Sequence, residues 1–205
     1  MIKVMEMRRK RIVIVAGLWA VVVSAVILIA YMLTTTLMPV IYFATSDNAE
    51  LQFPEYVTMG LSDKQEELFR LAEATLGDEK PSSFYESVPM DEPWCANYVS
   101  YLYREIALPF KNPVSGGWRI PGIYTLRDYL VQNGFWRDRE YTPVPGDIVI
   151  YDHGLFGGHT NIVLAVNGDE MMTIGGNENG KVRLMKFDYL DPIYGLVGYG
   201  HIIEE

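Results

Sequence analysis

The chain of 205 residues is long enough for one domain and an appended segment, and its formal net charge is −9. The charge is unevenly distributed, because the first 45 residues hold five of the 17 Lys and Arg side chains and one of the 26 Asp and Glu side chains. Residues 46–205 therefore carry 12 basic and 25 acidic side chains, a net charge of −13. Such an acidic domain argues against nucleic acid as a partner.

The N-terminal segment predicts a membrane anchor, because residues 12–33 form an apolar run of 22 residues without a charge. At about 1.5 Å per residue, a helix of this length is about 33 Å long, which is enough to cross a bilayer core of about 30 Å. A basic cluster precedes the run and no comparable cluster follows it; its members are Lys3, Arg8, Arg9, Lys10 and Arg11. The positive-inside rule then places the N-terminus in the cytoplasm.

We therefore expect a single-pass protein of the cytoplasmic (inner) membrane whose main domain faces the periplasm or the cell wall. The expected segments are a basic cytoplasmic tail (1–11), a transmembrane helix (12–34), a linker (35–61) and an extracytoplasmic domain (62–205). A cleaved signal peptide is the alternative. We favour it less, because its apolar core normally spans about 7 to 15 residues and no small-x-small cleavage site follows this run.

The domain is expected to contain helices first and antiparallel strands afterwards. Apolar residues at helical spacing and capping signals predict helices from Ser62 to Gly77, from about Trp94 to Leu108, and over 123–131. From residue 143 the apolar period changes to two, which predicts strands over 147–151, 160–166, 170–175, 181–187 and 196–203. This order is typical of an α+β fold rather than of alternating βαβ units.

The only cysteine, Cys95, lies at the predicted start of a helix, directly after Pro93 and Trp94. The positive end of the helix dipole favours a thiolate there, and the thiolate is the nucleophilic form of cysteine. A lone cysteine outside the cytoplasm forms no disulfide within the chain and is exposed to oxidation unless it is buried or used. The alternative is that Cys95 is simply a small buried apolar residue.

His159 stands at the start of a predicted strand, and a hairpin turn follows near residues 167–169. Two registers of this turn are possible, and they place His159 opposite either Gly176 or Glu178. In both registers Asn177 or Glu178 lies beside the imidazole. Directly paired side chains are close enough for a hydrogen bond that fixes the histidine tautomer.

A cysteine at a helix start, a histidine at a strand edge and a neighbouring amide or carboxylate form the Cys-His-Asn type of catalytic triad. In this hypothesis His159 holds the proton of Cys95, the thiolate attacks an amide carbonyl, and the backbone N–H of Cys95 is an oxyanion donor. The structural alternative is that His159 is an ordinary strand residue and that Asn177 belongs to a turn with Asn179 and Gly180.

Four motifs, taken in order, resemble the CHAP family of papain-like amidohydrolases and peptidases. They are PWCANYV (93–99), PGDIVIY (145–151), GHTNIV (158–163) and GGNEN (175–179). The resemblance covers roughly residues 64–203. It is strongest to a phage-associated branch whose motifs run PWCAAFVN, GDIVVF, GHVGFVV and LGGNQS.

The resemblance implies a papain-like fold in which Cys95 is the nucleophile, His159 the base and Asn177 the orienting residue, without a cofactor or a metal. It implies peptidoglycan as the substrate, cut between muramic acid and L-Ala or within the stem and cross-bridge peptides. Several lytic members carry an acidic residue two positions before the asparagine. This chain has Gly175 there, so Glu178 stays an alternative for the third role.

Other readings stay open. The domain can be a non-catalytic wall-binding or assembly subunit of a membrane complex with unknown protein partners, or a transacylase that uses the same Cys-His pair. His153 lies six residues before His159, which suggests a metal pair, although a third ligand is not evident. We expect His201 to be a strand residue. Aromatic side chains that can line a groove or pack in the core are Trp118, Tyr124, Phe135 and Trp136.

Overall fold

The computed structural model describes residues 2–34, 51–54, 60–79, 92–154 and 157–204. Most of the expected linker, 35–61, lies outside these residues. Of its described part, Leu51 and Phe53 pack against the core of the domain, and the Phe53 ring lies 6.3 Å from that of Phe69. This end of the expected linker therefore contributes to the domain.

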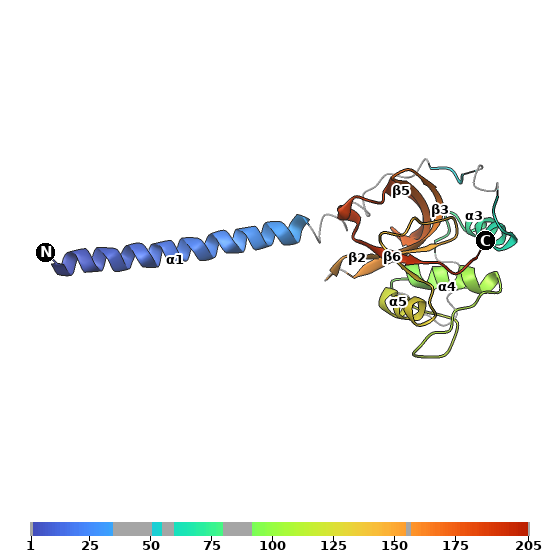
Figure 1. Ribbon diagram of the computed structural model, residues 1–205, viewed down its shortest axis with the longest axis horizontal. Coiled ribbons are helices and arrows are strands. Elements are labelled where there is room, and N and C mark those ends of the chain that lie inside the picture. The colour runs from blue at the N-terminus through green and yellow to red at the C-terminus, as the bar shows by residue number, and fades with distance from the viewer. Residues whose placement is uncertain (1, 35–50, 55–59, 80–91, 155–156, 205) are drawn as a thin grey trace.

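The N-terminal helix α1 (Ile2–Met32) extends away from the folded domain (Figure 1). Among the described residues, one stretch is long and apolar enough to cross a membrane, the 20 residues Val13–Met32. None of this stretch is buried, so it is not a core helix of the domain. Its length and composition fit a membrane span, and a signal sequence near an N-terminus meets the same criteria.

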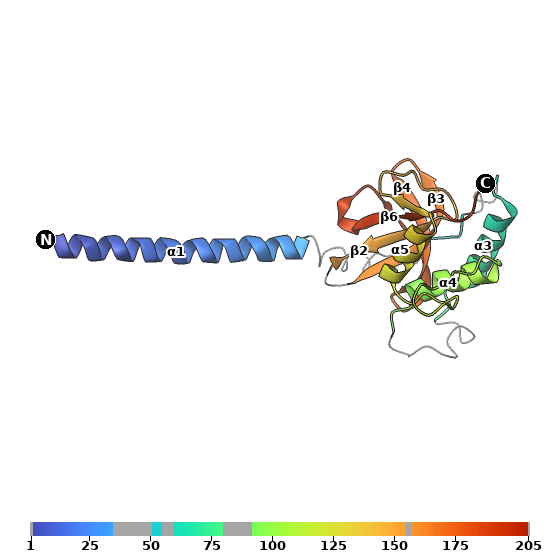
Figure 2. The same cartoon turned by 60° about the horizontal axis from the view of Figure 1, so that its bottom comes forward.

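In the part of the domain that the structure describes, three helices pack with a six-stranded antiparallel sheet, which confirms the α+β prediction (Figures 1 and 2). The helices are α3 (Asp63–Ala74), α4 (Cys95–Glu105) and α5 (Ile123–Gln132). The sheet has the order β1-β6-β2-β3-β4-β5. Its strands are β1 (Trp136–Asp138), β2 (Ile148–Asp152), β3 (Gly158–Asn167), β4 (Glu170–Glu178), β5 (Lys181–Asp188) and β6 (Leu196–Gly200).

The helix starts follow the capping signals in the sequence. Helix α3 begins after Ser62, whose backbone N–H donates to Oε1 of Gln65 at 2.8 Å, as in a capping box. Helix α4 begins at Cys95, within one residue of the predicted start. Two short elements were not predicted, strand β1 and the 3-10 turn Pro192–Tyr194, because three residues are too few to show a period.

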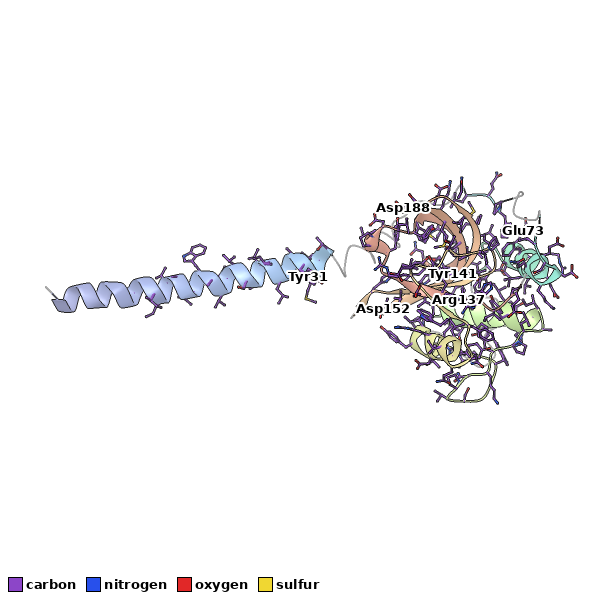
Figure 3. All side chains as sticks on the ribbon, viewed as in Figure 1. Tyr31, Glu73, Arg137, Tyr141, Asp152 and Asp188 are labelled. Atoms are coloured by element: carbon purple, nitrogen blue, oxygen red, sulfur yellow. The ribbon has the colours of Figure 1, made fainter. Side chains whose placement is uncertain are left out.

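The sheet is buried on both faces, because alternate side chains enter two apolar clusters. The cluster under the helices contains Ile148, Ile150, Ile162, Ile174 and Leu184 among others. The opposite cluster contains Val149, Tyr151, Val163, Met171 and Phe187 among others. Of the side chains labelled in Figure 3, Tyr141 packs partly buried against the second cluster, whereas Glu73 and Asp188 are exposed at the edge of the domain.

Helix α4 packs on β3 and β4, and this contact fixes the position of Cys95 relative to the sheet. The contact is close because Gly176 has no side chain. A Cβ atom there would lie 2.6 Å from the Trp94 ring and 2.6 Å from Cβ of Tyr98. The backbone of β4 therefore lies directly against the first turn of α4.

Candidate active site

Cys95 is the first residue of α4 and is 4% exposed. The preceding Trp94 is the N-cap residue and packs edge-on against Tyr98, with ring centroids 6.5 Å apart. Among the described residues, the backbone N–H of Cys95 has no hydrogen-bond partner, as expected for the first turn of a helix. The thiol and a backbone donor are thus presented together at a helix start.

His159 is the second residue of β3, and its side chain is 14% exposed. Its Nε2 atom lies 2.7 Å from Oε1 of Glu178. One face of the imidazole stacks on the ring of Tyr151, with centroids 6.5 Å apart and planes 23° apart. The ring position is therefore fixed by a neighbouring strand on one side and by a carboxylate on the other.

The thiol of Cys95 hydrogen-bonds the imidazole of His159. Because Nε2 is bonded to Glu178, Nδ1 is the ring nitrogen left for the thiol. Burial by itself lowers the pKa of His159, but the charges of Glu178 and Cys95 and the hydrogen bonds that the imidazole makes with both side chains raise this pKa well above its ordinary value. These partners therefore favour the protonated form of the imidazole.

The structure brings Glu178, and not Asn177, to the imidazole. A β-bulge in β4 is the reason: the pairing with β5 runs from Gly175 opposite Arg183 to Glu178 opposite Lys181, so that β4 contains one extra residue. Asn177 occupies the bulge with φ 62° and lines the cleft. Among the described residues its side chain makes no hydrogen bond. The bulge turns the side chain of Glu178 to the face of the sheet that carries His159.

Glu178 is 5% exposed and is held as a carboxylate. Burial by itself raises its pKa, but the charge of His159, the hydrogen bonds from His159 and Asn161 and the charge of Arg183 outweigh burial and lower this pKa. A positive imidazole and a negative carboxylate therefore stabilise each other beside the thiol.

A cleft of about 560 Å³ opens above these three residues. Its described lining combines the segment before α4, the start of α5, the loop before β3 and the bulge of β4. Tyr124 stands at one wall, 52% exposed, and its hydroxyl donates to Oδ1 of Asp152 at 3.1 Å. Glu92 also lines the cleft, and its Oε1 atom lies 3.5 Å from Nη1 of Arg119. An extended substrate can thus reach Cys95 from solvent.

The other two histidines have different surroundings. His153 is buried beside the cleft with Nε2 3.2 Å from the carbonyl oxygen of Tyr194, and burial lowers its pKa. The described residues contain no group of three or more His, Cys, Asp or Glu side chains that could hold a metal ion. His201 follows β6 rather than lying in it, and its Nδ1 lies 2.8 Å from Oδ1 of Asp147. The predicted last strand was therefore too long.

The sequence left open whether four aromatic residues line a groove or pack in the core, and the structure places them differently. Tyr124 lines the cleft, whereas Phe135 and Trp136 pack against the core. Trp118 lines a neighbouring hollow and lies under the guanidinium of Arg104, 4.2 Å from its ring centroid. Only Tyr124 of the four touches the cleft that contains Cys95.

Sequence reasoning missed Asn161, which donates to Glu178, and Tyr151, which supports the imidazole. A signal for Asn161 was present, because residues two apart on a strand share a face and Asn161 lies two residues after His159. Tyr151 carried no comparable signal, since it reads as one more apolar residue of a buried strand.

Comparison with protein families gives a match to the CHAP domain over residues 87–177. The chain is also similar to the crystal structure of Ly7917 (16% identity, TM-score 0.41), covering 66% of this chain and 60% of that chain. A second similar structure is that of Ly7917 with the hydrolyzing product of MDP (20% identity, TM-score 0.45, 66% and 61% covered). A third is the X-ray crystal structure of PlyC (14% identity, TM-score 0.42, 69% and 36% covered).

This chain thus spans about 60% of the Ly7917 chain and about a third of the PlyC chain. Comparison with curated proteins gave no match. The family match contains Cys95 and His159, ends at Asn177, and agrees with the motifs found in the sequence. The chain therefore contains a CHAP domain, at residues 87–177.

Proposed function

We propose that the protein is a membrane-anchored cysteine hydrolase that cleaves amide bonds of peptidoglycan, as an N-acetylmuramoyl-L-alanine amidase or a peptide endopeptidase. The CHAP domain supports the general class. The observation that carries the proposal is the continuous line of contacts from the Cys95 thiol through His159 to Glu178 beneath an open cleft. Cys95 is the nucleophile, His159 the acid and base, and Glu178 the orienting residue in place of Asn177.

The first half of the reaction forms an acyl-enzyme. The thiolate of Cys95 attacks the carbonyl carbon of the amide. The carbonyl oxygen becomes an oxyanion that accepts a hydrogen bond from the backbone N–H of Cys95. The imidazolium of His159 then gives its Nδ1 proton to the leaving amine. The C–N bond breaks, the amine leaves, and Cys95 holds the acyl group as a thioester.

The second half releases the acyl group. Neutral His159 takes a proton from a water molecule, and the resulting hydroxide attacks the thioester carbon. The C–S bond breaks, a carboxylic acid leaves, and the thiolate and imidazolium are restored. Throughout, the carboxylate of Glu178 keeps Nε2 of His159 protonated and Nδ1 directed at the reacting atoms.

The proposed anchor is the helix segment Val13–Met32, with the N-terminus in the cytoplasm and the domain outside. It would hold the enzyme next to the wall at a high effective concentration. The full-length chain should sediment with membranes and resist carbonate extraction. A chain that lacks residues 1–34 should remain in the supernatant, and release of the full-length chain by carbonate would contradict the anchor.

The proposed chemistry is tested by digesting purified peptidoglycan and identifying the new ends by mass spectrometry, with Cys95→Ala as the control. The expected result is a new amine and a new carboxyl group, which are absent with Cys95→Ala. New amide bonds to an added amine would indicate the transacylase instead. Unchanged peptidoglycan with binding preserved would indicate the non-catalytic wall-binding subunit.

Reactivity of the thiol gives a second test that needs no substrate. Cys95 should react with iodoacetamide near neutral pH faster than a model thiol, because the imidazolium of His159 stabilises its thiolate. His159→Ala should lower that rate to the level of the model thiol. A wild-type rate no faster than that of the model thiol would overturn the assignment of Cys95 as the nucleophile.

A further inference from the structure

Asn161 is a fully buried polar residue on β3, two positions after His159 and on the same face of the sheet. Its Nδ2 atom donates two hydrogen bonds. One goes to Oε1 of Glu178 at 2.9 Å and the other to Oγ1 of Thr173 at 3.1 Å. Asn161 therefore connects the carboxylate of the site to the interior of the sheet.

The amide of Asn161 can have only one orientation. The carboxylate of Glu178 accepts hydrogen bonds and cannot donate them, so the NH₂ group must face it. The oxygen Oδ1 then points toward Gly175, where a Cβ atom would collide with the amide. Among the described residues, this buried oxygen has no hydrogen-bond partner.

An unsatisfied buried oxygen makes this position unfavourable for stability alone. A leucine would occupy a similar volume without leaving a polar atom unpaired. The feature that only the amide supplies is its pair of donors. The more important donor contacts the same oxygen of Glu178 that His159 contacts, since Oε1 accepts from Nε2 at 2.7 Å and from Nδ2 at 2.9 Å.

We propose that Asn161 is a positioning residue of the active site, which fixes Oε1 of Glu178 so that the imidazole of His159 stays aligned with Cys95. This inference rests on the proposed function. Asn161 touches neither substrate nor thiol and acts through Glu178. Because the two hydrogen bonds meet at one oxygen, the amide also favours the charged form of the carboxylate.

The test compares Asn161→Leu with Thr173→Val. Asn161→Leu removes both donors, whereas Thr173→Val keeps the contact with Glu178 and removes only the structural partner of Asn161. In Asn161→Leu we expect kcat to fall about 10- to 100-fold with little change in KM. The low-pH limb of the rate profile should move up by about one pH unit, because the carboxylate loses a charge-assisted hydrogen bond. Thr173→Val should keep the wild-type pH profile.

A second variant covers the outcome in which Asn161→Leu does not fold. Asn161→Asp keeps the shape and replaces the donor by an acceptor beside Glu178, so kcat should fall and the low-pH limb should rise further than with leucine. Equal pH profiles in wild type and Asn161→Asp would overturn the positioning role. So would an equal shift in Thr173→Val and Asn161→Leu, which would show a general packing effect.

These results separate the inference from the function on which it rests. If Cys95→Ala abolishes hydrolysis while Asn161→Asp keeps the wild-type profile, the proposed function stands and the role of Asn161 fails. If Cys95→Ala remains active, the proposed function itself fails. The iodoacetamide rate of Cys95, measured against pH in the wild type, Asn161→Leu and Asn161→Asp, tests the role of Asn161 without substrate.

Discussion

Two histidine and carboxylate pairs of nearly equal geometry lie in this domain. His159 and Glu178 are 2.7 Å apart, and His201 and Asp147 are 2.8 Å apart. Both carboxylates are buried, and both imidazoles are partly exposed. The difference lies in the third partner. The first imidazole meets the thiol of Cys95 under the cleft, whereas the second meets the hydroxyl of Tyr141 at 3.3 Å.

The two carboxylates respond differently to burial. For Glu178, His159, Asn161 and Arg183 outweigh burial and the pKa is lowered. For Asp147, burial outweighs the hydrogen bonds from the Val144 N–H and His201, and the pKa is raised. A histidine beside a carboxylate is therefore not in itself a mark of catalysis. The thiol, the cleft and the additional donor to the carboxylate distinguish the two pairs.

The largest expected effect is on kcat/KM, which should fall when the pair of His159 and Glu178 is changed and not when the pair of His201 and Asp147 is changed. Glu178→Gln removes the counter-charge of the imidazolium, so kcat/KM should fall about 10²- to 10⁴-fold. The high-pH limb should also move to lower pH, because the pKa of His159 loses the charge that raises it. Asp147→Asn, the matched change in the other pair, should leave the pH profile of kcat/KM unchanged. Equal losses in both variants would remove the distinction drawn here.

The second pair should matter for stability instead. His201 connects the segment after β6 to Asp147, which precedes β2 by one residue and also accepts the Val144 N–H at 2.8 Å. His201→Ala removes one hydrogen bond from that buried carboxylate and should lower the free energy of unfolding by about 1 to 3 kcal/mol. Urea denaturation measures the change. A loss of activity in the folded variant would contradict the purely structural role of this pair.

Part of the candidate site could be predicted from the sequence. The start of α4 at Cys95 follows from Pro93 and the apolar stripe, and His159 follows from its place beside a predicted strand. These are local signals. The turn of the β3 and β4 hairpin, with Asn167 paired to Glu170, is also the second of the two registers considered, the one that places His159 opposite Glu178.

The exact choice between Asn177 and Glu178 could not be read in the same way. Bulges interrupt the pairing of β3 with β4 near Leu164 and that of β4 with β5 near Asn177, and each inserts a residue that period-two counting does not include. A one-residue change exchanges the side chains on the two faces. The contact between His201 and Asp147 joins residues 54 positions apart and likewise needs the folded sheet.

The smallest expected effect is a difference in how stability depends on pH. The folded-state pKa of His159 is raised above its ordinary value of 6.5, so its contribution is fully present below that value and is lost as pH rises through the raised pKa. The folded-state pKa of Glu178 is lowered below its ordinary value of 4.5, so its contribution is present above that value and is lost as pH falls through the lowered pKa. Together the pair stabilises the fold most between pH 4.5 and 6.5.

The pKa of Asp147 is shifted in the direction opposite to that of Glu178. Its raised pKa favours the fold at low pH, and that contribution is lost as pH rises through the raised value. Urea midpoints measured from pH 3 to 9 should therefore show a broad maximum in the wild type. Glu178→Gln should remove this maximum, because only this variant removes the charge that couples to His159. Asp147→Asn should keep the maximum and lower the urea midpoints at acidic pH relative to those at neutral pH. A maximum that persists in Glu178→Gln would show that the ion pair beside Cys95 contributes no pH-dependent stability.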